Sequence, residues 1–221
     1  MPATNFTSTV PALTQKAASQ KPTDFLDADT PVTVAAGYAR QFDVLKKGLS
    51  ATDLAVLEFI WGEDGSIVLA SQHPFSRGSV KLASADPFAA PILDAAFLRN
   101  PIDVDILVEG VKFVRKLTQT ASLAAISPSE LVPGANVTSD ADLQSFVRQN
   151  VGTTFHPVGS CALAPLNEGG CVDNQLRVYG IQGLRVADDR VMPLLPATHT
   201  QSTVYAIAEK VILYTDYLGT Q

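Results

Sequence analysis

Residues 100–117 read NPIDVDILVEGVKFVRKL and give the clearest structural signal in the chain. Asn100 can cap a helix, Pro101 suits the first helical position, and Asp103 suits the positively polarised N-terminus. Apolar residues then recur every three or four positions, at 104, 107, 108, 111, 114 and 117. This spacing is typical of a helix that buries one face, so the sequence predicts a long core-facing helix here.

Shorter elements are predicted on both sides of this helix. Apolar runs and alternations bounded by turn residues predict strands over residues 66–70, 79–83 and 184–188. Helical spacing of apolar residues predicts helices over 139–150 and 200–218, and a helix interrupted by Gly48 within 32–57. Residues 86–92 and 152–170 are rich in proline or glycine and predict irregular structure. Residues 1–31, with four prolines among Thr, Ser and Ala, predict a poorly ordered arm.

The composition excludes several classes of protein. The 221 residues are 46% hydrophobic and 17% charged, which excludes an intrinsically disordered chain. The net charge of −6 leaves no basic face for nucleic acid or for an anionic membrane. No apolar run approaches the ~20 residues of a membrane span, and no secretory signal is legible. We therefore expect a cytoplasmic protein that binds neither nucleic acid nor membrane.

The three histidines are the first candidates for chemistry. His156 lies in a glycine-flanked loop, and His199 lies between a proline-rich segment and the last predicted helix. Histidine exchanges protons near neutral pH, and loops held by rigid elements carry most functional residues. The pair can therefore act as acid and base, or both can be structural histidines bonded to the backbone. His73, beside Pro74, is interpreted as structural.

Four further residues allow weaker interpretations. Cys161 follows His156 closely, but a cysteine nucleophile would need a third group to orient the histidine, and none is evident. Two cysteines are too few for a zinc site, so no metal is expected. A disulfide between Cys161 and Cys171 fits the loop, but the expected cytoplasmic setting argues against it. Asp188 and Asp189 end a predicted strand and can face a ligand crevice or serve as cap and turn residues.

Five segments, taken together and in order, resemble the glucose–methanol–choline (GMC) oxidoreductases. They contain QHPFSRGSVKL, NPIDVDILVEGVKFVR, TTFHPVGSCA, VDNQLRVYG with LRVAD, and MPLLP with HTQSTVYAIAEK. They cover roughly residues 65–218. The resemblance implies an α+β fold: a substrate domain with an antiparallel sheet and helices, joined to the closing strand and helix of an FAD-binding domain. Residues 32–150 would be the substrate-domain portion, and 151–221 the catalytic-histidine loop with the C-terminal segment of the FAD-binding domain.

The resemblance also implies a reaction and a cofactor. Members of this family oxidise an alcohol by passing a hydride to FAD while a histidine takes the hydroxyl proton. By matching position His156 is that acid/base, and His199 falls at the second active-site position. Four other residues fall where the family contacts FAD, namely Asp188, Asp189, Thr200 and Gln201. Arg190, after Asp189, departs from the small residues usual there.

A G-x-G-x-x-G fingerprint occurs nowhere in the sequence. This motif places the FAD pyrophosphate on a helix N-terminus, and its absence predicts that the N-terminal Rossmann half is missing from a truncated chain. Three functions follow from this. The chain can be an FAD-dependent oxidoreductase of a small alcohol, a non-catalytic relic or accessory protein that no longer binds FAD alone, or one half of a two-chain flavoenzyme whose partner chain supplies the missing half.

Overall fold

The computed structural model describes residues 1–218, and the chain forms two compact units, each made of three separate stretches. Unit 1 comprises Met1–Gln20, Lys46–Ser76 and Phe97–Thr153, and unit 2 comprises Lys21–Leu45, Arg77–Ala96 and Thr154–Gln221. The predicted division into 1–31, 32–150 and 151–221 has other boundaries than these units and stays a prediction. The chain passes between the units several times, which composition along the sequence does not reveal.

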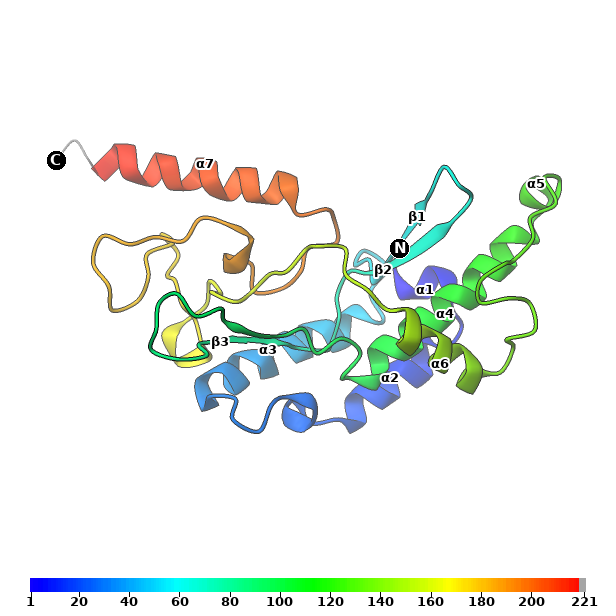
Figure 1. Cartoon of the computed structure of the whole chain (residues 1–221), viewed down its shortest axis with the longest axis horizontal. Helices are drawn as coiled ribbons and strands as arrows, with labels where there is room; N and C mark the ends of the chain where they lie inside the picture. Colours follow the sequence, from blue (N-terminus) through cyan, green and yellow to red (C-terminus); the bar gives the residue numbers. More distant parts are fainter. Residues whose placement is uncertain (219–221) are drawn as a thin grey trace. The chain divides into compact units, whose positions relative to one another are not determined.

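Unit 1 is built around the helix α4 (Pro101–Thr118), as predicted. The Asn100 side chain caps it by accepting the Ile102 N–H at 3.0 Å. Helix α6 (Asp140–Asn150) lies beside α4 (Figure 1) and is capped by Ser139. The two helices share a buried cluster composed of Leu98, Val104, Val108, Leu143 and Val147. A short helix α5 (Ala121–Ala124) follows α4.

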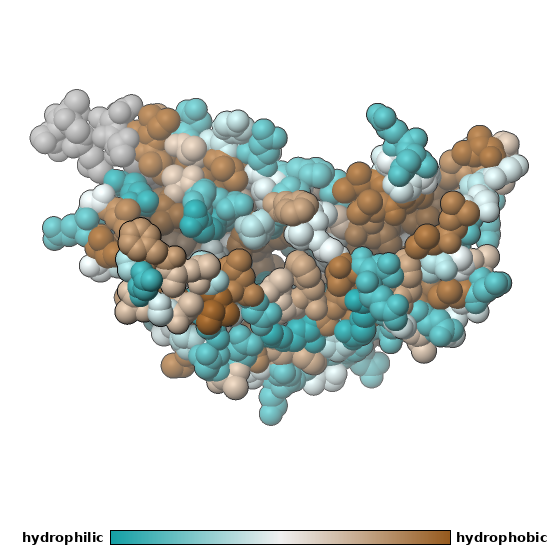
Figure 2. All heavy atoms as spheres, viewed as in Figure 1, coloured by the Kyte–Doolittle hydropathy of each residue, from teal (hydrophilic) through white to brown (hydrophobic). Residues whose placement is uncertain are grey.

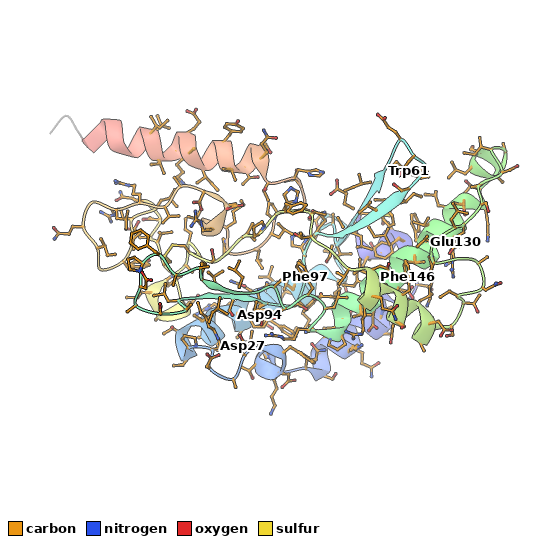
Figure 3. All side chains as sticks on the ribbon, viewed as in Figure 1. Asp27, Trp61, Asp94, Phe97, Glu130 and Phe146 are labelled. Carbon is orange, nitrogen blue, oxygen red and sulfur yellow. A yellow bond between two sulfur atoms is a disulfide. The ribbon has the colours of Figure 1, made fainter. Side chains whose placement is uncertain are left out.

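A two-stranded antiparallel hairpin packs on α4. Its strands are β1 (Leu57–Trp61) and β2 (Ile67–Ser71), paired so that Phe59 faces Leu69. The rings of Phe59 and Phe113 are 5.1 Å apart, which fixes the hairpin to the helix. Trp61, near the turn, is 51% exposed (Figure 3). The strand predicted at 66–70 is confirmed to within one residue, whereas β1 was not predicted and begins at Leu57, the last residue of the range expected to hold an interrupted helix.

The N-terminal residues of unit 1 are helical. Helices α1 (Ala3–Phe6) and α2 (Val10–Ser19) contact α4 and bury Phe6, Leu13 and Ala17. The prediction of a poorly ordered arm is therefore wrong. The few apolar side chains of this N-terminal stretch lie one helical turn or more apart on one face. Their burial on α4 outweighs the weak helix propensity of Thr and Ser.

Unit 2 contains most of α3 (Val32–Gly48) and a second antiparallel pair, β3 (Ser79–Lys81) and β4 (Ile92–Asp94). The Arg77 guanidinium lies 5.0 Å from the centre of the Tyr38 ring on α3, a cation–π contact. Helix α3 also approaches the short 3-10 helix η2 (Leu166–Glu168), because a side chain at Gly37 would meet the Glu168 carbonyl oxygen at 2.1 Å. The predicted strand at 79–83 is confirmed in its first three residues, and the unpredicted β4 begins at Ile92, the last residue of the stretch expected to be irregular.

The rest of unit 2 is largely irregular up to α7 (Gln201–Leu218), which confirms the last predicted helix; residues 219–221 lie outside the described part. Two more 3-10 helices are η1 (Pro22–Phe25) and η3 (Asp189–Val191). The strand predicted at 184–188 is wrong: the stretch forms only a single bridge, Arg177 to Arg185. A strand needs a continuous neighbour for its backbone groups, and residues 176–178 pair with this stretch over a short length only, through the Val178 N–H to the Leu184 carbonyl and the Val186 N–H to the Leu176 carbonyl.

Helices mixed with small antiparallel sheets confirm the α+β class. Within residues 1–218, no helix combines the length and the apolar character that a membrane crossing requires.

Candidate active site

His156 lies in an irregular segment of unit 2. Its side chain is half-buried, and its Nδ1 lies 3.5 Å from the Thr154 hydroxyl oxygen. The preceding Phe155 adopts φ 58° and is 83% exposed. A bulky residue in this left-handed region is uncommon, and it turns the chain sharply just before the histidine.

His199 meets His156 edge to face. The centroids of the two imidazole rings are 5.1 Å apart and the ring planes cross at 82°. His199 is exposed and lies directly before α7, whereas His156 is half-buried. The structure thus brings together the two histidines that the sequence singled out, from segments far apart in the chain. This arrangement can hold one proton donor and one acceptor beside a common reacting atom.

Backbone hydrogen bonds fix the chain just after His156. The N–H of Cys161 donates to the Arg190 carbonyl at 3.1 Å, and the N–H of Leu163 donates to the Val191 carbonyl at 2.8 Å. Gly159 has φ 83°, a conformation that favours glycine. The His156 loop therefore runs beside η3, the turn that leads toward His199.

Cys161 and Cys171 form a disulfide, with an S–S distance of 2.01 Å. The expectation that the two thiols stay reduced is therefore corrected: the loop between them folds back and brings their Cα atoms to 4.9 Å. A disulfide-bonded sulfur is no thiolate, so the Cys161 nucleophile hypothesis fails.

The two aspartates are engaged locally. Asp188 caps η3 by accepting the Arg190 N–H at 3.0 Å and pairs with the Arg190 guanidinium at 2.9 Å. Of the two interpretations of Asp188, the structure thus displays the cap and turn role. Asp189 is half-buried and is the first residue of η3.

Thr200 and Gln201 lie at the start of α7. The Thr200 side chain is buried, and its carbonyl accepts the Val204 N–H in the first turn of the helix. Gln201 is exposed at the first helical position. The first N–H groups of a helix have no partner within the helix, so this end can donate hydrogen bonds to an oxygen-rich ligand next to His199.

Sequence reasoning missed two features of the site, the disulfide and the backbone of Phe155. The sign of φ at a phenylalanine leaves no trace in the sequence. The cysteines were visible as a pair, but the expected compartment outweighed their spacing.

Comparisons with known proteins identify relatives of the chain over a range that includes both histidines. The GMC oxidoreductase family model matches residues 74–208. "GMC oxidoreductase family protein Mala s 12" of Malassezia sympodialis is 41% identical over 144 residues, 65% of this chain and 23% of that protein. Dehydrogenase pkfF of Emericella nidulans is 38% identical over 148 residues, 24% of its length. The chain thus spans about a quarter of the length of these curated relatives.

Solved structures match the fold. An FAD-dependent oxidoreductase from Chaetomium thermophilum superposes with a TM-score of 0.91 at 28% identity, covering 96% of this chain and 37% of that one. A fungal aryl-alcohol oxidase gives a TM-score of 0.84 at 36% identity, covering 94% of this chain and 36% of that one. These matches confirm the fold implied by the five segments.

Proposed function

The chain belongs to the GMC oxidoreductase family, and from this premise we propose that it contributes the proton-handling half of a flavin-dependent alcohol oxidation. The observation that carries the proposal is the edge-to-face pair of His156 and His199. Among the related solved structures, one is an FAD-dependent oxidoreductase and another is an aryl-alcohol oxidase, so the substrate we propose is a small alcohol.

His156 takes the hydroxyl proton of the alcohol. It is half-buried, so its ring nitrogen is less hydrated than that of an exposed histidine and can be directed at one reacting atom. The exposed His199 donates a hydrogen bond to the same oxygen and passes a proton to solvent. When bound, FAD supplies the two-electron acceptor for the hydride that leaves the alcohol carbon, so proton and hydride leave by separate routes.

The residues present fit one end of the flavin. The positively polarised N-terminus of the 18-residue helix α7 directly follows His199, with the amide of Gln201 exposed at its first position. These groups would bind carbonyl oxygens of the ring system, with Thr200 beside them. The Asp188 carboxylate is engaged with Arg190, so its proposed contact with FAD would require that pair to open.

The pyrophosphate end of FAD has no recognisable cradle in this sequence, which lacks G-x-G-x-x-G. A second polypeptide segment is therefore part of the proposal. Helix α7 exposes Tyr205 and Leu213, both 66% accessible, and Figure 2 shows hydrophobic residues on the surface over this helix. Since the chain matches about a third of each solved relative, we propose that an FAD-binding portion, on the same or a partner chain, supplies the rest.

Two measurements test this function. The visible spectrum of the chain, before and after adding FAD, shows whether flavin is retained through gel filtration. For the flavin-bound protein, alone or with an FAD-binding portion, His156→Ala should slow anaerobic flavin reduction by benzyl alcohol about 100-fold or more. His73→Ala is the control, because His73 lies in unit 1, bonded to the Ala55 carbonyl.

The outcomes separate the alternatives. A His156→Ala rate equal to that of the His73→Ala control would remove the proposed role of His156. A protein that stays colourless under every condition would favour the non-catalytic relic.

A further inference from the structure

We propose that the Cys161–Cys171 disulfide is a positioning cross-link that holds the His156 and His199 imidazoles in their edge-to-face arrangement. This inference rests on the proposed function only for its catalytic consequence. The geometric claim concerns the two rings alone, and it is tested without flavin.

His156 has no regular element of its own to orient it. Residues 151–165 form neither helix nor strand, and after His156 the backbone is tied to η3 at Cys161 and Leu163. Segments outside helices and strands open more easily than those within them. The orientation of His156 therefore depends on how firmly the chain is held at Cys161.

The disulfide holds Cys161 from the side opposite η3. Cys171 donates its N–H to the Ala162 carbonyl at 2.9 Å, and its own carbonyl accepts the Tyr179 N–H at 3.0 Å. The Tyr179 hydroxyl then returns to the Ala164 carbonyl at 3.2 Å. Cross-link and hydrogen bonds thus clamp residues 161–164 between η3 and the 171–179 segment.

His199 depends on the same cross-linked core. The buried residues Val172, Leu176 and Val191 form this core, and both cysteines pack against it. Ile207 and Val211 of α7 pack on it as well, which anchors the helix that begins just after His199. Both histidines are therefore tied to one small cluster, and the disulfide lies within it.

A core with three buried residues supplies little hydrophobic stabilisation, and small cores of this kind depend on cross-links. If the disulfide is opened, residues 161–164 keep only their hydrogen bonds to η3 and to the 171–179 segment, while α7 keeps its packing. The rings should then separate although the helices persist. This selective loss distinguishes a positioning cross-link from one that merely stabilises the fold.

The test compares a Cys161→Ala/Cys171→Ala double variant with Val191→Ala, which weakens the same core but keeps the cross-link. The readout is the nuclear Overhauser effect between the ring protons of His156 and His199 in the full chain. In the wild type the effect is expected, because the ring centroids are 5.1 Å apart. We expect the intensity of this effect to fall at least several-fold in the double variant and to persist in Val191→Ala. The helical circular dichroism signal should be unchanged in both variants.

If the double variant does not fold, the wild-type chain is titrated with dithiothreitol, a dithiol that takes up the disulfide's oxidation and leaves two protein thiols. Loss of the ring–ring effect while the helical signal stays intact supports the proposal. An effect that survives full reduction, or that vanishes only together with the helical signal, overturns it. In a flavin-loaded enzyme the double variant should lower kcat about tenfold with KM little changed, the pattern of misplaced catalytic groups.

The proposed function can fail separately. If no alcohol reduces the flavin but the ring–ring effect depends on the disulfide, the cross-link still positions the pair and only the reaction assignment is wrong.

Discussion

Asp103 in unit 1 offers a sharp test of how the chain between the hairpin and α4 is held. Its side chain is only 2% exposed, yet it carries a carboxylate. One oxygen accepts the Phe75 N–H and the other accepts the Ser76 N–H, each at 2.7 Å. Asp103, interpreted from the sequence as a favourable charge at a helix N-terminus, thus also ties the chain after β2 to α4.

The cost of removing this carboxylate follows from those two bonds. Asp103→Ala takes the charged acceptor away from two backbone N–H groups, one of them on the buried Phe75. Losing the partner of a buried donor costs about 1–3 kcal/mol, and more when the partner is charged. We therefore expect the free energy of unfolding to fall by roughly 3–5 kcal/mol, a large fraction of the ~5–15 kcal/mol typical of a domain.

Urea unfolding followed by circular dichroism measures this change in the full chain. Asp103→Asn keeps one acceptor oxygen, so it should lose about half as much. Asp53→Ala removes an exposed aspartate and is the control, expected within ~0.5 kcal/mol of wild type. If Asp103→Ala unfolds at the same urea concentration as Asp53→Ala, the two hydrogen bonds do not stabilise the unit and the reasoning fails.

Two further changes probe unit 1 and its charges, and one exposed leucine serves as a control. Leu143→Ala leaves a cavity at a fully buried position between α4 and α6, so it should lower the free energy of unfolding in urea by about 2–5 kcal/mol. An equal free energy of unfolding for Leu166→Ala, at an exposed site, would contradict this. Burial alone would raise the pKa of Glu109, but hydrogen bonds from Thr7 and Lys112 and the charge of Lys112 outweigh it and lower the pKa. This stabilisation is present at pH values above the ordinary pKa of 4.5 and is lost as pH falls through the lower pKa of the folded state. In a plot of the urea midpoint of unfolding against pH, Glu109→Gln should therefore flatten the fall in the midpoint on the acid side. An unchanged fall would refute this.

The parts of the fold that could be predicted are those whose signals are local. Helix α4 begins where Asn100 and Pro101 place it, and α6 begins after Ser139, because caps and apolar spacing act within a few residues. The strands were predicted less accurately than these helices. β1 and β4 owe their structure to a partner strand, whereas the stretch 184–188 pairs with residues 176–178 over too short a length to form a strand.

The candidate site divides in the same way. His156 and His199 could be chosen because histidine chemistry and loop setting are legible in a sequence. Their edge-to-face contact could not, because it arises from the packing of α7 and of the 161–172 segment on one core. The N-terminal helices were missed for the same reason, since Phe6 becomes a core residue only against Phe59 and Phe113.

A site built from two irregular segments needs something other than a sheet to fix its geometry. In unit 2 the backbone after His156 meets η3 through hydrogen bonds at Cys161 and Leu163, and its other side is held by the disulfide together with hydrogen bonds to the 171–179 segment. A covalent clamp holds its end of the loop however small the surrounding core, whereas hydrogen bonds at an exposed loop exchange with water. Under the proposal above, the alignment of His156 with His199 depends on the oxidised state of two cysteines that take no part in the proposed proton transfer, which would link the proposed chemistry of the pair to the redox conditions in which the chain folds.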